Sequence, residues 1–96
     1  MADATTFLAE WYLPDLAEAA VNDIVARIDA AASTVSGEGT PVRLLMTLSV
    51  PTDEVLYGVF DAGSPEAVVT TCRRAGVPHQ RLSDHVVARL ARGVPS

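Results

Sequence analysis

The chain has 96 residues, of which 49% are apolar, and its formal net charge is −5. All seven positively charged side chains are arginine, which excludes a lysine Schiff base and a P-loop lysine. The acidic balance argues against nucleic acid as a partner, because phosphate binding depends on clustered basic side chains. The length predicts a single domain, residues 1–96, with no internal linker.

The sequence pattern favours a cytoplasmic protein. No apolar run approaches the roughly 18 residues that a membrane-spanning helix requires, so we expect no membrane partner. Residues 1–5 lack the basic start and the apolar core of a signal peptide. Cys72 is the single cysteine, so no intramolecular disulfide is expected.

The first part of the chain predicts a strand followed by a long helix. Residues 6–13 alternate in the manner of a strand, and Pro14 ends the run. In residues 16–35, apolar side chains recur at steps of three and four, which places them on one side of a helix. We expect Asp15 to cap the start of this helix and Gly37 to end it.

The middle of the chain predicts a hairpin and a second helix. Residues 42–50 and 55–60 both have the pattern of short strands, and the turn at 51–54 leaves room only for a direct connection. The second helix starts at residues 64–66, where a serine cap precedes a proline at the first helical position and an acid. It ends at Gly76.

The last predicted strand covers residues 82–90, and residues 91–96 form a loose tail. The order strand, helix, strand, strand, helix, strand is typical of the ferredoxin-like α+β sandwich. We therefore expect a four-stranded antiparallel sheet with both helices on one face. Right-handed crossovers place the first and third strands at its centre and the second and fourth at its edges.

The predicted strands are apolar on both faces, as the neighbours Leu44 and Leu45 illustrate. Because the helices cover only one face, the other would expose a large apolar surface. We predict a homodimer in which the open sheet faces of two copies pack together. A bound small molecule is the alternative way to cover this surface.

Two residues are candidates for acid–base catalysis. Glu10 lies in the middle of the first strand, where lost solvation favours the protonated carboxyl and suits proton transfer. His85 lies on the last strand, which neighbours the first, so the two side chains are a possible dyad. The alternative is that Glu10 forms an ion pair with Arg81 or Arg89 and that His85 is simply solvated.

Four residues are candidates for a ligand pocket. Trp11, Tyr12 and Tyr57 each join an apolar ring to a polar donor, which suits a pocket wall, although core packing is the alternative. Cys72 completes the set; it is otherwise a small buried residue, or a thiol made reactive by the nearby arginines. We expect no metal site and no cofactor, since HxxxH, HExxH, CxxC and a glycine-rich phosphate loop are all missing from the sequence.

Four segments together resemble a small bacterial family of unknown function whose best-known branch binds nickel. The segments are EWYLP at 10–14, GTPVR at 39–43, FDAGSPEAV at 60–68 and RRAGVP at 73–78. The resemblance covers nearly the whole chain and implies a dimeric ferredoxin-like fold. In the nickel-binding branch, histidines lie on the first strand just before Leu-Pro and on the second helix just before its final glycine. This chain has Trp11 and Tyr12 in the first region and Thr71, Cys72 and Ala75 in the second, which disfavours nickel binding.

The leading hypothesis from the sequence is a homodimer that binds a small apolar or amphipathic molecule near the first strand. One alternative is a cofactor-independent isomerase or cyclase that uses Glu10 and His85. A nickel-binding protein is the disfavoured alternative.

Overall fold

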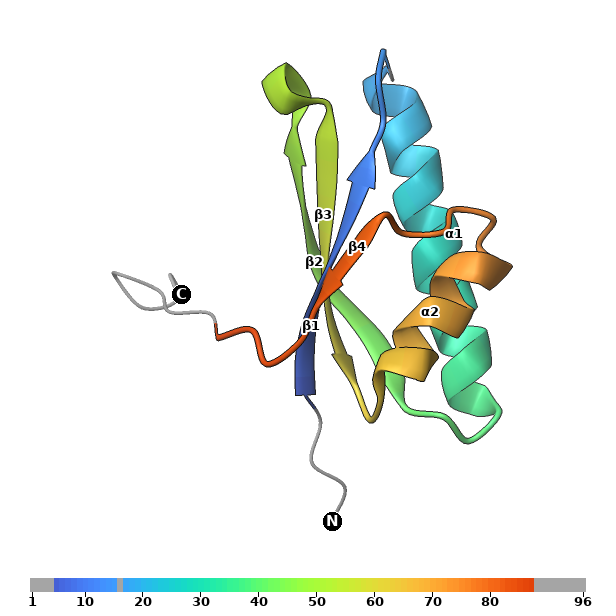
Figure 1. Ribbon diagram of the computed structural model, residues 1–96. Helices are drawn as coiled ribbons and strands as arrows, with labels where there is room; N and C mark the ends of the chain where they lie inside the picture. Colours follow the sequence, from blue (N-terminus) through green and yellow to red (C-terminus); the bar gives the residue numbers. More distant parts are fainter. Residues whose placement is uncertain (1–4, 16, 88–96) are drawn as a thin grey trace, which may run out of the picture.

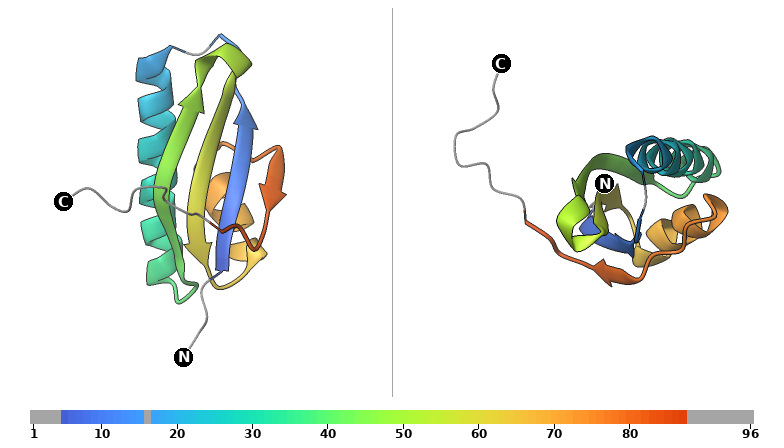
Figure 2. Two further views of the ribbon diagram at one scale, coloured as in Figure 1. Left: turned by 90° about the vertical axis from the view of Figure 1, so that its left-hand side faces the viewer. Right: turned by 90° about the horizontal axis from the view of Figure 1, so that it is seen from above.

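The computed structural model describes residues 5–15 and 17–87. Its elements are β1 (Thr5–Tyr12), α1 (Glu18–Gly37), β2 (Val42–Val50), the 3₁₀ turn η1 (Pro51–Asp53), β3 (Val55–Ala62), α2 (Pro65–Arg74) and β4 (Arg81–Ser83). Within this part of the chain the strands form a four-stranded antiparallel sheet in the order β2-β3-β1-β4. Both helices cover the same face of this sheet (Figure 1 and Figure 2). The predicted ferredoxin-like fold, with its central and edge strands, is confirmed.

The core lies between the sheet and the helices, because alternate residues of the two central strands point toward the helices. β1 and β3 pair along their whole length, from Thr5 opposite Ala62 to Tyr12 opposite Val55. The buried side chains of these strands are Phe7, Ala9, Trp11, Leu56, Phe60 and Ala62. The helices add Ile24, Ile28, Ala32 and Val35 from α1, and Ala67, Val68, Thr71 and Cys72 from α2.

Trp11 is the largest fully buried side chain of this core, and it links β1 to β3 and to the segment that follows α2. Its indole N–H donates a hydrogen bond of 2.7 Å to the carbonyl oxygen of Val77, beyond the end of α2. Its ring lies 6.4 Å from the ring of Phe60, tilted by 57°. Gly58 leaves the space that the indole occupies, since a Cβ at that position would lie 2.8 Å from the ring.

The start of α1 differs from the prediction. The N-cap residue is Ala17, which makes no side-chain capping bond, so the expected cap at Asp15 is wrong. Asp15 instead has a φ of 57°, in the left-handed region that aspartate tolerates better than most residues. The backbone N–H of Asp15 donates a hydrogen bond to the side chain of Glu54. This bond holds Asp15 against the β2–β3 connection, so Asp15 does not start the helix.

The last strand also differs from the prediction. β4 contains only Arg81–Ser83, and His85 has a φ of 53°, which breaks the pairing with β1. Beyond β4 the chain contacts the edge of β1 again, where the Val86 N–H donates to the Thr6 carbonyl oxygen at 3.0 Å. The prediction of a strand over residues 82–90 is therefore wrong for residues 84–87. Its end at 88–90 and the predicted tail at 91–96 lie outside the described residues.

Candidate functional site

The sheet face opposite the helices carries apolar side chains from β2, β3 and β1. Figure 2 shows this face toward the viewer in its left view, with the helices behind it. Register and alternation place Leu8, Tyr12, Met46, Leu48, Tyr57 and Val59 on it. Tyr12, Met46 and Leu48 are about half exposed, at 54%, 49% and 50%. We call these six residues the open face.

A β-bulge explains how β2 accommodates two consecutive leucines. The pairing with β3 shifts between Leu44 and Met46, so Leu45 is the extra residue. Leu44 is opposite the buried Phe60 and packs against the core, while Leu45 is 42% exposed at the sheet edge. The bulge therefore returns Met46 and Leu48 to the open face.

Glu10 lies on the same side of the sheet as the open face and faces Arg81. The register places these two residues opposite each other, and Arg81 Nε lies 3.7 Å from Glu10 Oε2. The alternative of an ion pair with Arg81 is thereby confirmed, whereas Arg89 lies outside the described residues. His85 Nδ1 lies 3.4 Å from the carboxylate of its neighbour Asp84. The register thus brings Arg81, not His85, to the position opposite Glu10.

The four predicted pocket residues divide between two surroundings. Trp11 and Cys72 belong to the core, with exposed fractions of 1% and 0%. Burial raises the pKa of the Cys72 thiol to about 12, so thiolate chemistry is not available at neutral pH. Tyr12 and Tyr57 lie on the open face. The hydrogen bond from the Tyr12 hydroxyl to Glu54, together with the charge of that carboxylate, raises the pKa of Tyr12.

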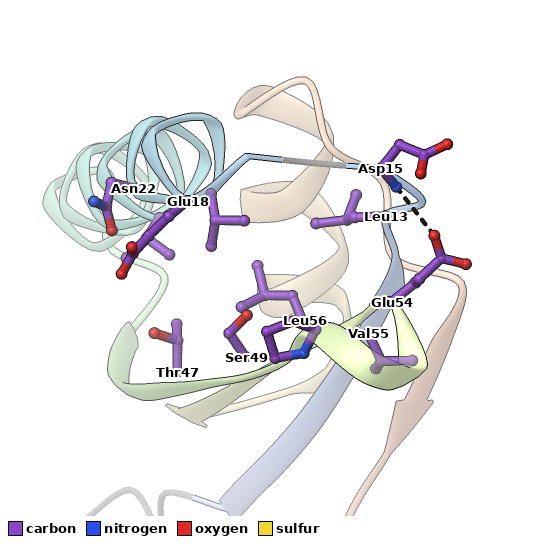
Figure 3. A pocket seen from close by; sticks show the side chains of 12 residues that line it. Leu13, Asp15, Glu18, Asn22, Thr47, Ser49, Glu54, Val55 and Leu56 are labelled. Carbon is purple, nitrogen blue, oxygen red and sulfur yellow. Dashed lines mark hydrogen bonds between the residues drawn. The ribbon is translucent and has the colours of Figure 1, made fainter.

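A groove with a volume of about 720 Å³ opens between the first half of α1, the end of β1 and the β2–β3 hairpin. Its apolar lining consists of Leu13, Val21, Val25, Pro51, Val55 and Leu56. Its polar lining consists of Asp15, Glu18, Asn22, Thr47, Ser49 and Glu54. Figure 3 shows Glu18 and Asn22 on the α1 side, with Asp15 and Glu54 across from them.

The groove exists because β2 presents small polar side chains to the helix side of the sheet. Thr47 is opposite the buried Gly58, and Ser49 is opposite the buried Leu56, so both side chains lie on the face that α1 covers elsewhere. Large apolar side chains at these two positions would fill the space against α1. Sequence reasoning missed the groove, because alternation places Thr47 and Ser49 on one face of β2 but does not say that this face is the helix side.

Glu54 shapes one end of the groove through three hydrogen bonds to the β1–α1 connection. Its carboxylate accepts one from the Tyr12 hydroxyl at 3.1 Å and one from the Asp15 N–H at 3.1 Å. Its carbonyl oxygen accepts one from the Leu13 N–H at 2.8 Å. Glu54 itself has a φ of 56°, a left-handed conformation that glutamate rarely adopts without such constraint. The sequence indicated only a turn at this position.

The part of the chain that the structure describes has neither a metal-binding cluster nor a membrane-spanning helix. In residues 5–15 and 17–87, no group of three or more His, Cys, Asp or Glu side chains could hold a metal ion. No helix in the same part of the chain is long and apolar enough to cross a membrane.

The fold and the groove together define a small ferredoxin-like α+β protein with a candidate ligand site at one end of its sheet. No protein-family model matches the chain, and no curated protein matches it. Among solved structures, the crystal structure of SCO4226 from Streptomyces coelicolor A3(2) is similar, with a TM-score of 0.75. The match covers 88% of this chain and 99% of that one at 14% sequence identity. At this identity the likeness shows the fold alone.

Proposed function

We propose that this protein is a cytoplasmic homodimer that binds a small apolar or amphipathic molecule in the groove at the end of β1. The observation that carries the proposal is the groove itself. Its volume of about 720 Å³ lies within the roughly 300–1,000 Å³ of small-molecule sites. Apolar walls supply the affinity of such sites, and a few polar groups orient the ligand. Leu13, Val21 and Leu56 fit the first role, and Asn22, Thr47 and Ser49 fit the second.

The open face supports the homodimer. Monomeric proteins rarely expose apolar patches larger than a few hundred Å², and larger ones usually mark interfaces. Met46, Leu48 and Tyr12 are half exposed on one sheet face, and a second copy offers a surface of the same kind. Among the charged groups on this side of the sheet, Arg43 lies opposite Asp61 near one end of β3. Glu10 lies between Leu8 and Tyr12 on β1, and its carboxylate pairs with Arg81 of the edge strand β4. Protein interfaces combine an apolar core with a polar rim, and the positions of Arg43 and Asp61 fit such a rim.

The dimer is tested by sedimentation equilibrium at micromolar concentration. We expect twice the mass of one chain, and Leu48→Glu should give the mass of one chain because it places a charge in the centre of the interface. Thr52→Glu, on the exposed turn η1, is the control and should leave the dimer intact. A wild-type protein that sediments as a single chain contradicts the dimer and leaves the groove untouched.

The groove is tested by titrating ¹⁵N-labelled protein with a neutral apolar probe, 1-naphthalenemethanol, and following amide shifts by NMR. We expect saturable shifts that centre on Val21, Val25, Thr47 and Leu56. Thr47→Phe should abolish them by filling the groove, whereas the same substitution at the exposed Thr52 should not. Ser49→Phe provides a second filling variant. Shifts that centre elsewhere, or that survive both filling variants, contradict the groove as the binding site.

A further inference from the structure

The groove combines apolar walls with a rim whose charges all have one sign. Carboxylates come from Asp15, Glu18 and Glu54, and in the described part of the chain no arginine or histidine lines the groove. A site of this composition distinguishes ligands by charge as well as by shape, because like charges repel and opposite charges attract across a partly desolvated opening. The negative charge of the rim therefore constrains the charge of the ligand.

Within the described residues, none of these three carboxylates forms an ion pair with a cation. The ion pairs within residues 5–15 and 17–87 are Arg27 with Asp23, Arg74 with Glu38, Arg81 with Glu10, and His85 with Asp84. The carboxylate of Glu54 accepts its hydrogen bonds from two neutral donors, the Tyr12 hydroxyl and the Asp15 N–H, so neither donor offsets its negative charge. The N-terminal end of α1 is equivalent to about half a positive charge, which offsets part of Glu18 alone.

The carboxylates also lie on opposite sides of the opening. Figure 3 shows Glu18 on the α1 side, with Asp15 and Glu54 at the hairpin end across the groove. The carboxylates of Asp15 and Glu54 point away from the groove in this view, so both act through their field rather than by direct contact. At physiological salt such a field extends over roughly 8 Å, and it is screened less where water is partly excluded.

We propose that the groove selects small amphiphilic cations, such as a primary amine on an apolar ring or chain, over neutral and anionic molecules of the same shape. This inference rests on the proposed function, because it assigns the charge of the ligand that the groove binds. The apolar part of the ligand lies against Leu13, Val21 and Leu56, and the ammonium group lies at the rim near Glu18. The same rim disfavours carboxylate and phosphate ligands.

The test compares three probes that share one ring system. 1-Naphthylmethylamine carries a positive charge at pH 7, 1-naphthalenemethanol is neutral, and 1-naphthaleneacetate is negative. We expect the amine to bind roughly threefold to tenfold more tightly than the alcohol, which is the scale of a few partly exposed charge contacts. The acetate should bind more weakly than the alcohol. Added salt should reduce the advantage of the amine and leave the affinity for the alcohol nearly unchanged.

Two double variants separate the rim from the overall charge. Asp15→Asn with Glu18→Gln removes two rim charges with little change of shape, and asparagine tolerates the left-handed backbone at position 15. Asp29→Asn with Glu66→Gln removes two exposed charges from positions that do not line the groove. We expect the rim variant to lose the preference for the amine while it still binds the alcohol, and the control variant to keep the preference.

The outcomes distinguish the two proposals. If none of the three probes shifts the groove amides, the proposed function is contradicted, and this inference is contradicted with it. If all three bind with equal affinity, or if the two double variants behave alike, the binding function stands and the charge selection is overturned.

Discussion

The carboxylate of Glu54 accepts a hydrogen bond from the hydroxyl of Tyr12, 42 residues earlier in the chain, at 3.1 Å. The second carboxylate oxygen holds the N–H of Asp15, so one side chain ties the β2–β3 hairpin to the segment that leads into α1. A negatively charged acceptor stabilises the protonated phenol, which is why the pKa of Tyr12 is raised.

We predict that Glu54→Gln lowers the pKa of Tyr12 toward its ordinary value of 10.0, because the variant removes the acceptor charge. The pKa is measured from phenolate absorbance in a Tyr57→Phe background, where Tyr12 is the single tyrosine of the chain. Asp53→Asn, next to Glu54 in the turn, is the control and should leave the pKa of Tyr12 unchanged, because the Tyr12 hydroxyl donates to Glu54. An equal effect of both variants would show that general charge, not this hydrogen bond, sets the pKa.

Local sequence signals predicted those parts of the fold that depend on neighbours in the chain. β2 covers residues 42–50 as the alternation indicated, and Ser64 caps α2 by accepting a hydrogen bond from the Ala67 N–H at 3.3 Å. The sheet order followed from the element order and the handedness of crossovers.

The features that sequence reasoning missed depend on contacts between distant segments. Asp15 has the residue type of a helix cap, yet Glu54 draws its backbone into a turn. The groove requires that Thr47 and Ser49 lie on the helix side of β2, and the bulge at Leu45 decides which side each residue of that strand occupies. A shift of one residue exchanges the two faces of a strand, so alternation alone does not fix them.

The contact between Gly58 and Trp11 predicts an unusual effect of a small substitution. Alanine is ordinarily more favourable than glycine within a strand. Gly58→Ala should nevertheless destabilise the protein by about 1–3 kcal/mol, the cost of overpacking a core. The new Cβ would lie 2.8 Å and 3.0 Å from two atoms of the Trp11 ring, and the hydrogen bond to Val77 restrains that ring.

The measurement for Gly58→Ala is urea unfolding followed by Trp11 fluorescence, with Gly63→Ala as the matched control. A Cβ at Gly63 has no atom within 4 Å, so this variant should remain within about 0.5 kcal/mol of the wild type. Equal stability of the two variants would mean that the indole moves aside at little cost.

Arg27 connects α1 to the end of α2. Its Nε and Nη2 atoms donate hydrogen bonds of 3.1 Å and 2.6 Å to the carbonyl oxygen of Ala75, and its Nη1 lies 3.5 Å from Asp23. We predict that Arg27→Met lowers the free energy of unfolding by about 1 kcal/mol. Two charge-assisted hydrogen bonds would contribute more if they were buried, but this side chain is half exposed and water weakens them.

The matched control for Arg27 is Asp23→Asn, which removes the exposed ion pair but keeps both hydrogen bonds to Ala75. Its effect on urea unfolding should be below about 0.5 kcal/mol. If Asp23→Asn costs as much as Arg27→Met, the helix-to-helix hydrogen bonds contribute little and the ion pair carries the effect.

The buried thiol of Cys72 predicts how stability falls at high pH. Burial raises its pKa from 9.0 to about 12, so between these pH values the thiol stays protonated in the folded protein and ionises in the unfolded chain. The unfolded state then binds fewer protons, and the free energy of unfolding decreases as the pH rises through this window. The slope that this group adds approaches about 1.4 kcal/mol per pH unit. With no lysine in the chain, few other groups titrate in this range.

Cys72→Ala isolates this contribution, because both tyrosines are present in the wild type and in the variant and cancel in the difference. At pH 8 the variant should be less stable, since it leaves a small cavity in the core. The two proteins should converge in urea unfolding between pH 9 and pH 11, as the wild type loses the contribution of its protonated thiol. Parallel pH dependences would contradict the raised pKa. In the wild-type protein, a thiol reagent should label Cys72 only after unfolding, because the thiol is fully buried in the folded protein.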